Sequence, residues 1–191
     1  MNSNQEMGKI KFFKESIKNL KTVGTITRSS KYLCKAMIKP VDFKNAKVIV
    51  ELGAGDGVVT SHILSAMEPD AKLLAFELNS KFCDQIRQQI KDDRLIIIED
   101  DASKIKEYLD ANGLEKADAV ISALPFTLIP EEIAYQIVRS CKDNMKEGGT
   151  YVQIHYSLIA KKYYKNVFGN IDIRFIPINV PPAWVMVCNN I

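Results

Sequence analysis

The stretch "VIVELGAGDGVVTSHIL", residues 48–64, decides the fold. It begins with five residues suited to a buried strand, continues through a glycine-rich turn and ends in a helical pattern of apolar residues. A glycine-rich turn between a strand and a helix typically receives a nucleotide, because the backbone there can approach a ligand closely. The stretch therefore predicts an α/β domain with a nucleotide site at the end of its first strand.

Strand-like and helix-like segments alternate along the rest of the chain. The predicted strands are residues 47–52, 72–76, 94–98, 117–124, 150–156, 171–180 and 183–188. The predicted helices are residues 58–67, 80–90 with Asn79 as the cap, 103–111, 130–146 with Gly148-Gly149 as the terminator, and 157–168. Only Pro181-Pro182 separates the last two strands, which predicts an antiparallel hairpin at one sheet edge. The pattern predicts a three-layer α/β sandwich, Rossmann-like, with a mixed seven-stranded sheet.

Length and composition are typical of one domain. The chain has 191 residues, of which 47% are hydrophobic, enough for a single core. No stretch approaches the roughly 18 uncharged apolar residues that would span a membrane. The four cysteines form no CxxC pair and lie far from either histidine, which indicates reduced thiols rather than a metal site. We expect a cytoplasmic protein without a bound metal.

Positive charge is concentrated near the N-terminus. Residues 9–47 carry eleven Lys or Arg against Glu15 and Asp42, a balance of +9, whereas the remainder has a balance of −6. Such asymmetry indicates a basic arm that faces a polyanion, either nucleic acid or an anionic lipid surface. A merely solvated lysine-rich face is the alternative. We expect residues 1–46 to form a basic helical arm or lid, and residues 47–191 to form the nucleotide-binding domain.

The arm also has an amphipathic pattern. Ile10, Phe13, Ile17 and Leu20 recur on one helix face, and lysines occupy the flanks. Apolar residues opposite lysines suit an anionic membrane surface, although packing of the same stripe on the core is an alternative. An RNA-binding arm would show more arginines and exposed aromatic residues. Lipid is therefore favoured as the partner, RNA stays possible, and the sequence implies no obligate protein partner.

The glycine spacing distinguishes between nucleotides. A dinucleotide site needs G-x-G-x-x-G/A, but its third position is Val58 here, and no Gly-Lys-Ser/Thr follows as a P-loop requires. The observed pattern places Glu51, Gly53, Gly55 and Gly57 at alternate positions. This spacing resembles motif I of the class I S-adenosylmethionine-dependent methyltransferases.

Further motifs continue that resemblance in the expected order. Glu77 and Leu78 follow the second strand, where the family's acidic residue accepts hydrogen bonds from the ribose hydroxyls. Asp101 and Ala102 follow the third strand, where the family holds the adenine. The resemblance implies S-adenosylmethionine as the cofactor, although each acid alone would also suit a surface position at a strand end. The implied cofactor-binding residues are Glu51, Gly53, Gly55, Gly57, Glu77, Leu78, Asp101, Ala102 and Ser122.

The segment "SALPF", residues 122–126, concerns the methyl acceptor. It resembles the N-x-P-[FY] motif of amino-methyltransferases, in particular the rRNA adenine dimethyltransferases. There an asparagine side chain and a backbone carbonyl accept hydrogen bonds from the exocyclic amine. We place Ser122 at the asparagine position, where its shorter hydroxyl is only a partial substitute.

A second resemblance covers nearly the whole chain. The bacterial soluble-type phospholipid N-methyltransferases, and the related ornithine-lipid N-methyltransferases, have a basic N-terminal segment, a V-G-x-I-x-x-S-S stretch and then the nucleotide core. Here these are "VGTITRSS" at residues 23–30, followed by ELGAGDG, FELN, SALPF and YVQIHYS. The resemblance implies methyl transfer to a phosphatidylethanolamine-like amine head group by a protein peripherally associated with the inner membrane surface. The alternatives are an rRNA adenine N6-methyltransferase and a cofactor-binding protein without catalysis.

The acceptor chemistry suggests further site residues. A lipid primary amine resembles lysine, with a pKa near ~10.4, and is protonated at neutral pH. An apolar pocket lowers that pKa without a dedicated base. Ser122, Pro125 and Phe126 are expected to position the acceptor. His155 or Tyr156, at the end of the fifth strand, is expected to take the proton or to hold the cation against its ring, unless His155 is a structural strand-end histidine.

Overall fold

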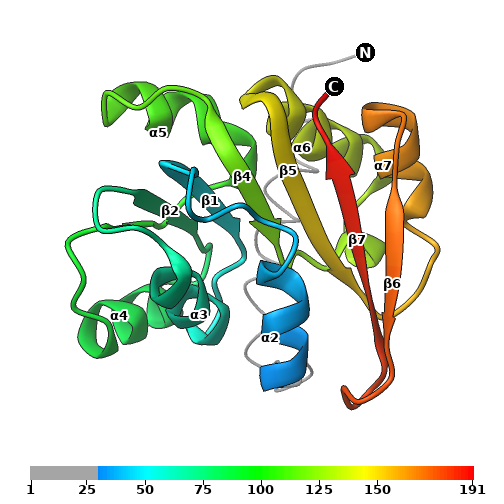
Figure 1. Ribbon diagram of the computed structural model, residues 1–191, viewed down its shortest axis with the longest axis horizontal. Helices are drawn as coiled ribbons and strands as arrows, with labels where there is room; N and C mark the ends of the chain where they lie inside the picture. The colour runs from blue at the N-terminus through cyan, green and yellow to red at the C-terminus, as the bar shows by residue number, and fades with distance from the viewer. Residues whose placement is uncertain (1–29) are drawn as a thin grey trace.

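A computed structural model describes residues 30–191, which form a seven-stranded sheet with helices on both faces (Figure 1). The strand order is β3-β2-β1-β4-β5-β7-β6, and β7 runs antiparallel to both of its neighbours. The strands are β1 (Val48–Leu52), β2 (Lys72–Phe76), β3 (Leu95–Ile98), β4 (Ala117–Ser122), β5 (Met145–His155), β6 (Asp172–Ile176) and β7 (Ala183–Asn189). The predicted fold class and the C-terminal hairpin are confirmed.

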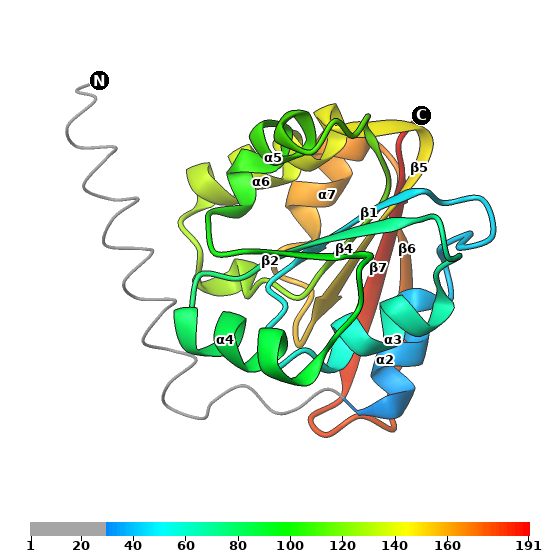
Figure 2. The same ribbon diagram turned by 90° about the vertical axis from the view of Figure 1, so that its left-hand side faces the viewer.

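Helices cover the two faces of the sheet in separate groups (Figure 2). One face carries α5 (Ile105–Ala111), α6 (Glu131–Asp143) and α7 (Lys161–Phe168), and the other carries α2 (Lys31–Ile38), α3 (Val58–Ala66) and α4 (Ser80–Gln89). Two short 3-10 turns, η2 (Ala102–Lys104) and η3 (Phe126–Leu128), follow β3 and β4. Within residues 30–191, no helix is long and apolar enough to cross a bilayer.

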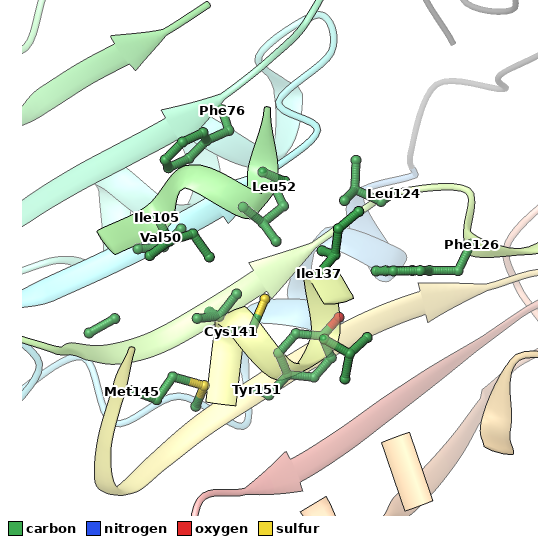
Figure 3. Close-up of a cluster of buried hydrophobic side chains, with 14 of the residues drawn as sticks. Val50, Leu52, Phe76, Ile105, Leu124, Phe126, Ile137, Cys141, Met145 and Tyr151 are labelled. Atoms are coloured by element: carbon green, nitrogen blue, oxygen red, sulfur yellow. The ribbon is translucent and has the colours of Figure 1, made fainter. Parts of the chain in front are cut away.

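Burial of strands on both faces produces two main apolar clusters. Leu52, Phe76, Phe126 and Tyr151 belong to the cluster beneath α5, α6 and α7 (Figure 3). Side chains that alternate with them along the strands, such as Ile121, join a cluster beneath α2 and α3. Each large apolar side chain buried in this way contributes about 1.5–3 kcal/mol, so both layers hold the sheet in register.

The glycine pair at residues 148–149 does not end a helix as predicted. The helix α6 already ends at Asp143, and both glycines lie inside β5. A Cβ atom on Gly149 would come within 2.9 Å of the carbonyl oxygen of Lys146 and 3.2 Å of that of Asp118. This close approach accompanies a register shift between β4 and β5. The pair therefore accommodates an irregular strand pairing, which a sequence pattern does not distinguish from a helix C-terminus.

Two other predicted boundaries are wrong by several residues. The helix α7 begins at Lys161 rather than at residue 157, because residues 157–160 form a bend after β5. The strand β6 ends at Ile176 rather than at residue 180. Both differences lengthen loops at the carboxyl end of the sheet.

The helix α2 belongs to the domain and not to a separate arm. Ser30 caps it by accepting a hydrogen bond from the Leu33 N–H at 3.2 Å. Leu33, Cys34 and Met37 are fully buried against α3 and the sheet. The packed structure therefore includes residues 30–46, which the prediction had assigned to the arm. The amphipathic stripe at residues 10–20 lies outside the described residues.

We expect Leu33→Ala to destabilise the whole domain. Removing a fully buried leucine costs about 2–5 kcal/mol, because transfer energy is lost and a cavity remains. Urea unfolding followed by circular dichroism measures the change. Tyr32→Ala is the matched control, because Tyr32 is on the same helix but 60% exposed. Equal unfolding midpoints for the two variants would mean that α2 is not part of the core.

Candidate active site

The glycine turn after β1 is shaped by backbone conformations that favour glycine. Gly53, Gly55 and Gly57 have φ angles of 79°, 59° and 81°. A Cβ atom on Gly53 would lie 3.2 Å from the Leu124 side chain, so the turn packs closely against the loop after β4. Around Gly55, the nearest atom to such a Cβ is the Gly53 carbonyl oxygen at 3.9 Å. The backbone at Gly55 therefore borders open space that a ligand can approach.

Glu77, directly after β2, connects this turn to the neighbouring strand. Its carboxylate accepts hydrogen bonds from the Gly55 N–H at 2.8 Å and from the Asn79 N–H at 3.0 Å. The residue is only 2% exposed. Asn79 in turn caps α4 by accepting from the Lys81 N–H, as predicted. A carboxylate is an acceptor-only group, so its position beside the turn suits a ligand that carries hydroxyl donors.

Glu51 supports the turn from inside the protein. It lies near the end of β1, is 1% exposed, and accepts a hydrogen bond from the Thr60 hydroxyl at 2.7 Å. This contact ties β1 to α3. Glu51 does not line the pocket described next, and its predicted direct contact with a cofactor stays a prediction.

A pocket lies at the carboxyl ends of the first four strands, where open α/β sheets bind their ligands. Its lining residues are Gly53, Phe76, Glu77, Leu78, Asp100, Asp101, Ala102, Leu124, Ile129 and Ile137. Five of these were predicted from motifs: Gly53, Glu77, Leu78, Asp101 and Ala102. The walls are mostly apolar and a few carboxylates converge on them, which is typical of sites for small organic cofactors.

The other lining residues were missed by sequence reasoning. Ile129 precedes α6 and Ile137 lies on it, where the sequence shows only an ordinary apolar helix pattern. Such a pattern predicts burial but does not indicate a ligand. Phe76 and Leu124 adjoin predicted site residues, and this adjacency was the one available signal.

The two acids after β3 have different surroundings. Asp101 caps η2 by accepting from the Ser103 N–H at 2.7 Å. Asp100 accepts from the Lys104 ammonium at 2.8 Å and from the Tyr108 hydroxyl at 3.0 Å. Burial alone would raise the pKa of Asp100, but these contacts outweigh it and leave that pKa below its ordinary value. This side of the pocket therefore carries an ionised carboxylate at neutral pH.

The segment after β4 is held by hydrogen bonds from the interior. The Ser122 hydroxyl accepts from the Leu124 N–H at 3.3 Å, and the Gln153 side chain donates to the Leu124 carbonyl oxygen at 3.0 Å. Ser122 and Gln153 are both fully buried. The structure thus places Ser122 beneath the loop rather than on the pocket wall, and its predicted roles in cofactor and acceptor contact stay predictions.

The motif spacing gives a second correction. Counting back from Pro125 and Phe126, the asparagine of an N-x-P-[FY] pattern falls on Ala123 and not on Ser122. Alanine has no hydrogen-bonding side chain. The loop therefore lacks the amide acceptor that an exocyclic adenine amine would use.

The two residues at the end of β5 face different environments. His155 is 4% exposed, and its Nε2 lies 2.7 Å from the Tyr164 hydroxyl. Burial lowers the pKa of His155 to about 4, so the ring is neutral at pH 7. Phe126 packs near both rings, with centroids 6.3 Å from His155 and 5.9 Å from Tyr164. His155 thus lies inside the protein, as its structural alternative requires, and its role at the acceptor stays a prediction. Tyr156 is 43% exposed and does face outward.

We expect the buried His155 to make stability depend on pH. Its pKa is about 4 in the folded protein against 6.5 for the ordinary group. Below pH 6.5 the unfolded chain therefore binds a proton that the folded protein excludes. The free energy of unfolding should fall by up to about 3 kcal/mol from this group as the pH drops from 6.5 to 4. Urea unfolding across this range measures the slope.

The matched variants separate this contribution from that of other groups. His155→Gln should flatten the pH dependence, because glutamine does not titrate. His62→Gln should keep the wild-type slope, because His62 is only half-buried and His155 remains. Parallel pH profiles for His155→Gln and the wild type would contradict the placement of His155.

Comparison with known proteins agrees with this arrangement. Over 95% of its length the chain is 28% identical to the ornithine lipid N-methyltransferase of Singulisphaera acidiphila, of which the match covers 93%. It is 29% identical to the ribosomal RNA small subunit methyltransferase H of Christiangramia forsetii, but over only 47% of this chain and 28% of that protein. The precorrin-6y C5,15-methyltransferase structure from Geobacter metallireducens superimposes with a TM-score of 0.67 at 16% identity, covering 86% of this chain and 90% of that one.

A family model makes the assignment. The methyltransferase domain model matches residues 49–149, more than half of the chain, from β1 into β5. This range includes the glycine turn, both strand-end acid positions and the loop after β4. The enzyme is an S-adenosylmethionine-dependent methyltransferase, and the chain belongs to the methyltransferase domain family.

Proposed function

We propose that this enzyme transfers methyl groups from S-adenosylmethionine to the amine head group of a membrane aminolipid, such as a phosphatidylethanolamine-like phospholipid. The loop at residues 122–126 carries the proposal, since Ala123 stands where an adenine-methylating site would need an amide acceptor. The similarity to an ornithine lipid N-methyltransferase along nearly the whole chain supports it. The ribosomal RNA methyltransferase match, by contrast, covers less than half of the chain.

We further propose which residues hold the cofactor. When bound, S-adenosylmethionine supplies an electrophilic methyl group on a positively charged sulfur. Glu77 would accept hydrogen bonds from the ribose hydroxyls, and the backbone near Gly55 would face the same part of the ligand. Asp101 and Ala102 would border the adenine, with Ile129 and Ile137 as the apolar wall on which a flat ring packs. The carboxylates and apolar walls of the pocket suit the hydroxyl donors and the flat ring of such a ligand.

An amine acceptor also suits the part of the site near Leu124 and Tyr156, where the side chains carry no charge. At pH 7, removing the proton from an ammonium with a pKa near ~10.4 costs roughly 4.6 kcal/mol. His155 is an unsuitable base, because it is buried, bound to Tyr164 and has a pKa of about 4. Desolvation beside Leu124 and Tyr156 would lower the ammonium pKa instead. We propose that Pro125 and Tyr156 border the acceptor, with the tyrosine ring beside the cationic head group.

The basic segment before residue 30 is proposed as a membrane anchor at the inner membrane surface. Its support is the sequence alone, because these residues lie outside the described part of the chain. Lysines near an anionic leaflet each contribute about 1 kcal/mol, and the apolar stripe at residues 10–20 adds a hydrophobic contribution.

We expect Glu77→Gln to weaken S-adenosylmethionine binding at least tenfold. The amide keeps the side-chain shape but loses the charge, and hydrogen bonds to charged groups are worth about 1.5–3 kcal/mol each. Isothermal titration calorimetry measures the affinity. Glu99→Gln is the matched control, an exposed glutamate at the end of β3. If both variants bind as tightly as the wild type, Glu77 does not contact the cofactor.

We incubate the enzyme and radiolabelled S-adenosylmethionine with total lipid in one assay and with total RNA in another. We expect the labelled methyl group to enter the lipid and not the RNA. Purified phosphatidylethanolamine should accept label, whereas phosphatidylcholine, already quaternary at nitrogen, should not. Transfer should accelerate as the pH rises from 7 to 9, because the free amine fraction grows up to about tenfold per unit below the amine pKa. Label in RNA alone would reject the lipid proposal and favour an rRNA adenine N6-methyltransferase.

A further inference from the structure

Large apolar side chains are exposed on two adjacent loops, the β5–α7 loop (residues 156–160) and the β6–β7 loop (residues 177–182). Ile159 is 74% exposed, Ile178 64% and Val180 78%. We call the following set the apolar rim: Tyr156, Leu158, Ile159, Phe175, Ile178 and Val180. Single exposed apolar residues are ordinary, but a group of this kind marks an interaction surface.

The two loops are joined to each other at the carboxyl end of the sheet. His155 in β5 and Phe175 in β6 both pair with Trp184 in β7, so the loops emerge side by side. The Asn179 side chain lies close enough to Tyr156 to oppose the rise that burial causes in the pKa of that tyrosine. The parallel strands end at this same edge, where the pocket lies, and the β6–β7 loop is at the opposite end of the molecule from the C-terminus (Figure 1).

The loops of the apolar rim are uncharged and lysines lie next to them, a distribution that suits an anionic lipid surface. Residues 152–160 and 175–191 contain no Asp, Glu, Lys or Arg. Lysines adjoin these loops along the chain: Lys161 follows the β5–α7 loop, and the exposed Lys31 follows Ser30, which is bonded to Asn179 of the β6–β7 loop. A neutral apolar tip flanked by lysines matches a bilayer surface, in which acyl chains lie beneath anionic head groups.

The chain enters the described domain beside the apolar rim. The Ser30 N–H donates to the Asn179 side-chain oxygen in the β6–β7 loop at 3.3 Å. The basic residues 9–28 are therefore covalently joined to the domain next to these loops. Positive charge on both sides of this junction favours an anionic lipid surface over a neutral partner.

We propose that the apolar rim inserts into the interfacial layer of an anionic bilayer and places the acceptor side of the pocket against the head groups. This inference rests on the proposed function for the nature of the surface, but it assigns the contact to folded loops of the domain rather than to the basic arm. A bilayer contact of this kind brings a lipid amine to the enzyme without extracting the lipid.

Trp184 is a native reporter for this contact. It is the only tryptophan of the chain, and its ring lies 5.0 Å from that of Phe175. With the full-length protein, vesicles of phosphatidylglycerol and phosphatidylethanolamine that carry brominated acyl chains should quench its fluorescence. The double variant Ile178→Asp/Val180→Asp should lose the quenching and bind vesicles at least tenfold more weakly. Both side chains are exposed, so the fold should persist in circular dichroism.

Ile191→Asp is the matched control, because Ile191 is 83% exposed but lies beyond the other end of β7. It should keep wild-type quenching. The inference is overturned if vesicles bind the wild type without quenching Trp184, or if the double variant behaves as the wild type does. It is also overturned if sedimentation velocity shows a dimer that the double variant converts to a monomer, because the rim then joins two copies.

A second measurement separates this inference from the proposed function. Methyl transfer to phosphatidylethanolamine dispersed in detergent micelles requires no bilayer insertion, so the double variant should retain it. If the wild type methylates lipid in micelles but vesicles do not quench its Trp184, the docking surface is rejected and the proposed function stands. Quenching by vesicles without transfer to any aminolipid would support the docking surface and reject the function.

Discussion

The hydrogen bond from the Gly55 N–H to the Glu77 carboxylate is the contact on which the site depends. It joins the turn after β1 to the end of β2, two segments that parallel pairing brings side by side. A second bond from the Asn79 N–H fixes the carboxylate itself. Because charge-assisted bonds of this kind are stronger than neutral ones, one buried acid holds both the cofactor turn and the start of α4.

The sequence specifies the site best where chemistry and backbone geometry impose a residue type. The glycine turn needs positive φ angles, and the apolar run of β2 matches its predicted bounds because both faces of that strand are buried. Residues 31–39 were assigned to the arm because Lys31, Lys35 and Lys39 continue its basic pattern. Leu33 and Met37, spaced four apart, nevertheless bury one face of α2.

The predicted site residues that do not line the pocket share a physical cause. His155 and Ser122 occupy strand ends, where the direction of a side chain depends on pairing register and on what packs above it. Because side chains alternate between the two faces of β5, His155 lies beneath α7, next to Tyr164. A buried hydrogen bond directs the Ser122 hydroxyl toward its own loop. A motif gives the residue type but not this direction. Gly149 shows the same limit for the backbone, because the carbonyl oxygens of Lys146 and of Asp118 in β4 lie too close for a Cβ atom.

The sheet order divides the carboxyl edge into two chemical halves. The ends of β2 and β3 carry the carboxylates Glu77, Asp100 and Asp101, which suit a ligand rich in hydroxyl and amino donors. The ends of β5 and β6 and the start of the antiparallel β7 carry neutral aromatic and aliphatic groups, and the loop after β4 lies between the halves. Under the proposed function, an ammonium group at this boundary would leave water on the apolar side, which would favour the neutral amine that attacks a methyl group. The proposed reaction would then need alignment and desolvation more than a dedicated base, and the neutral, buried His155 is consistent with that requirement.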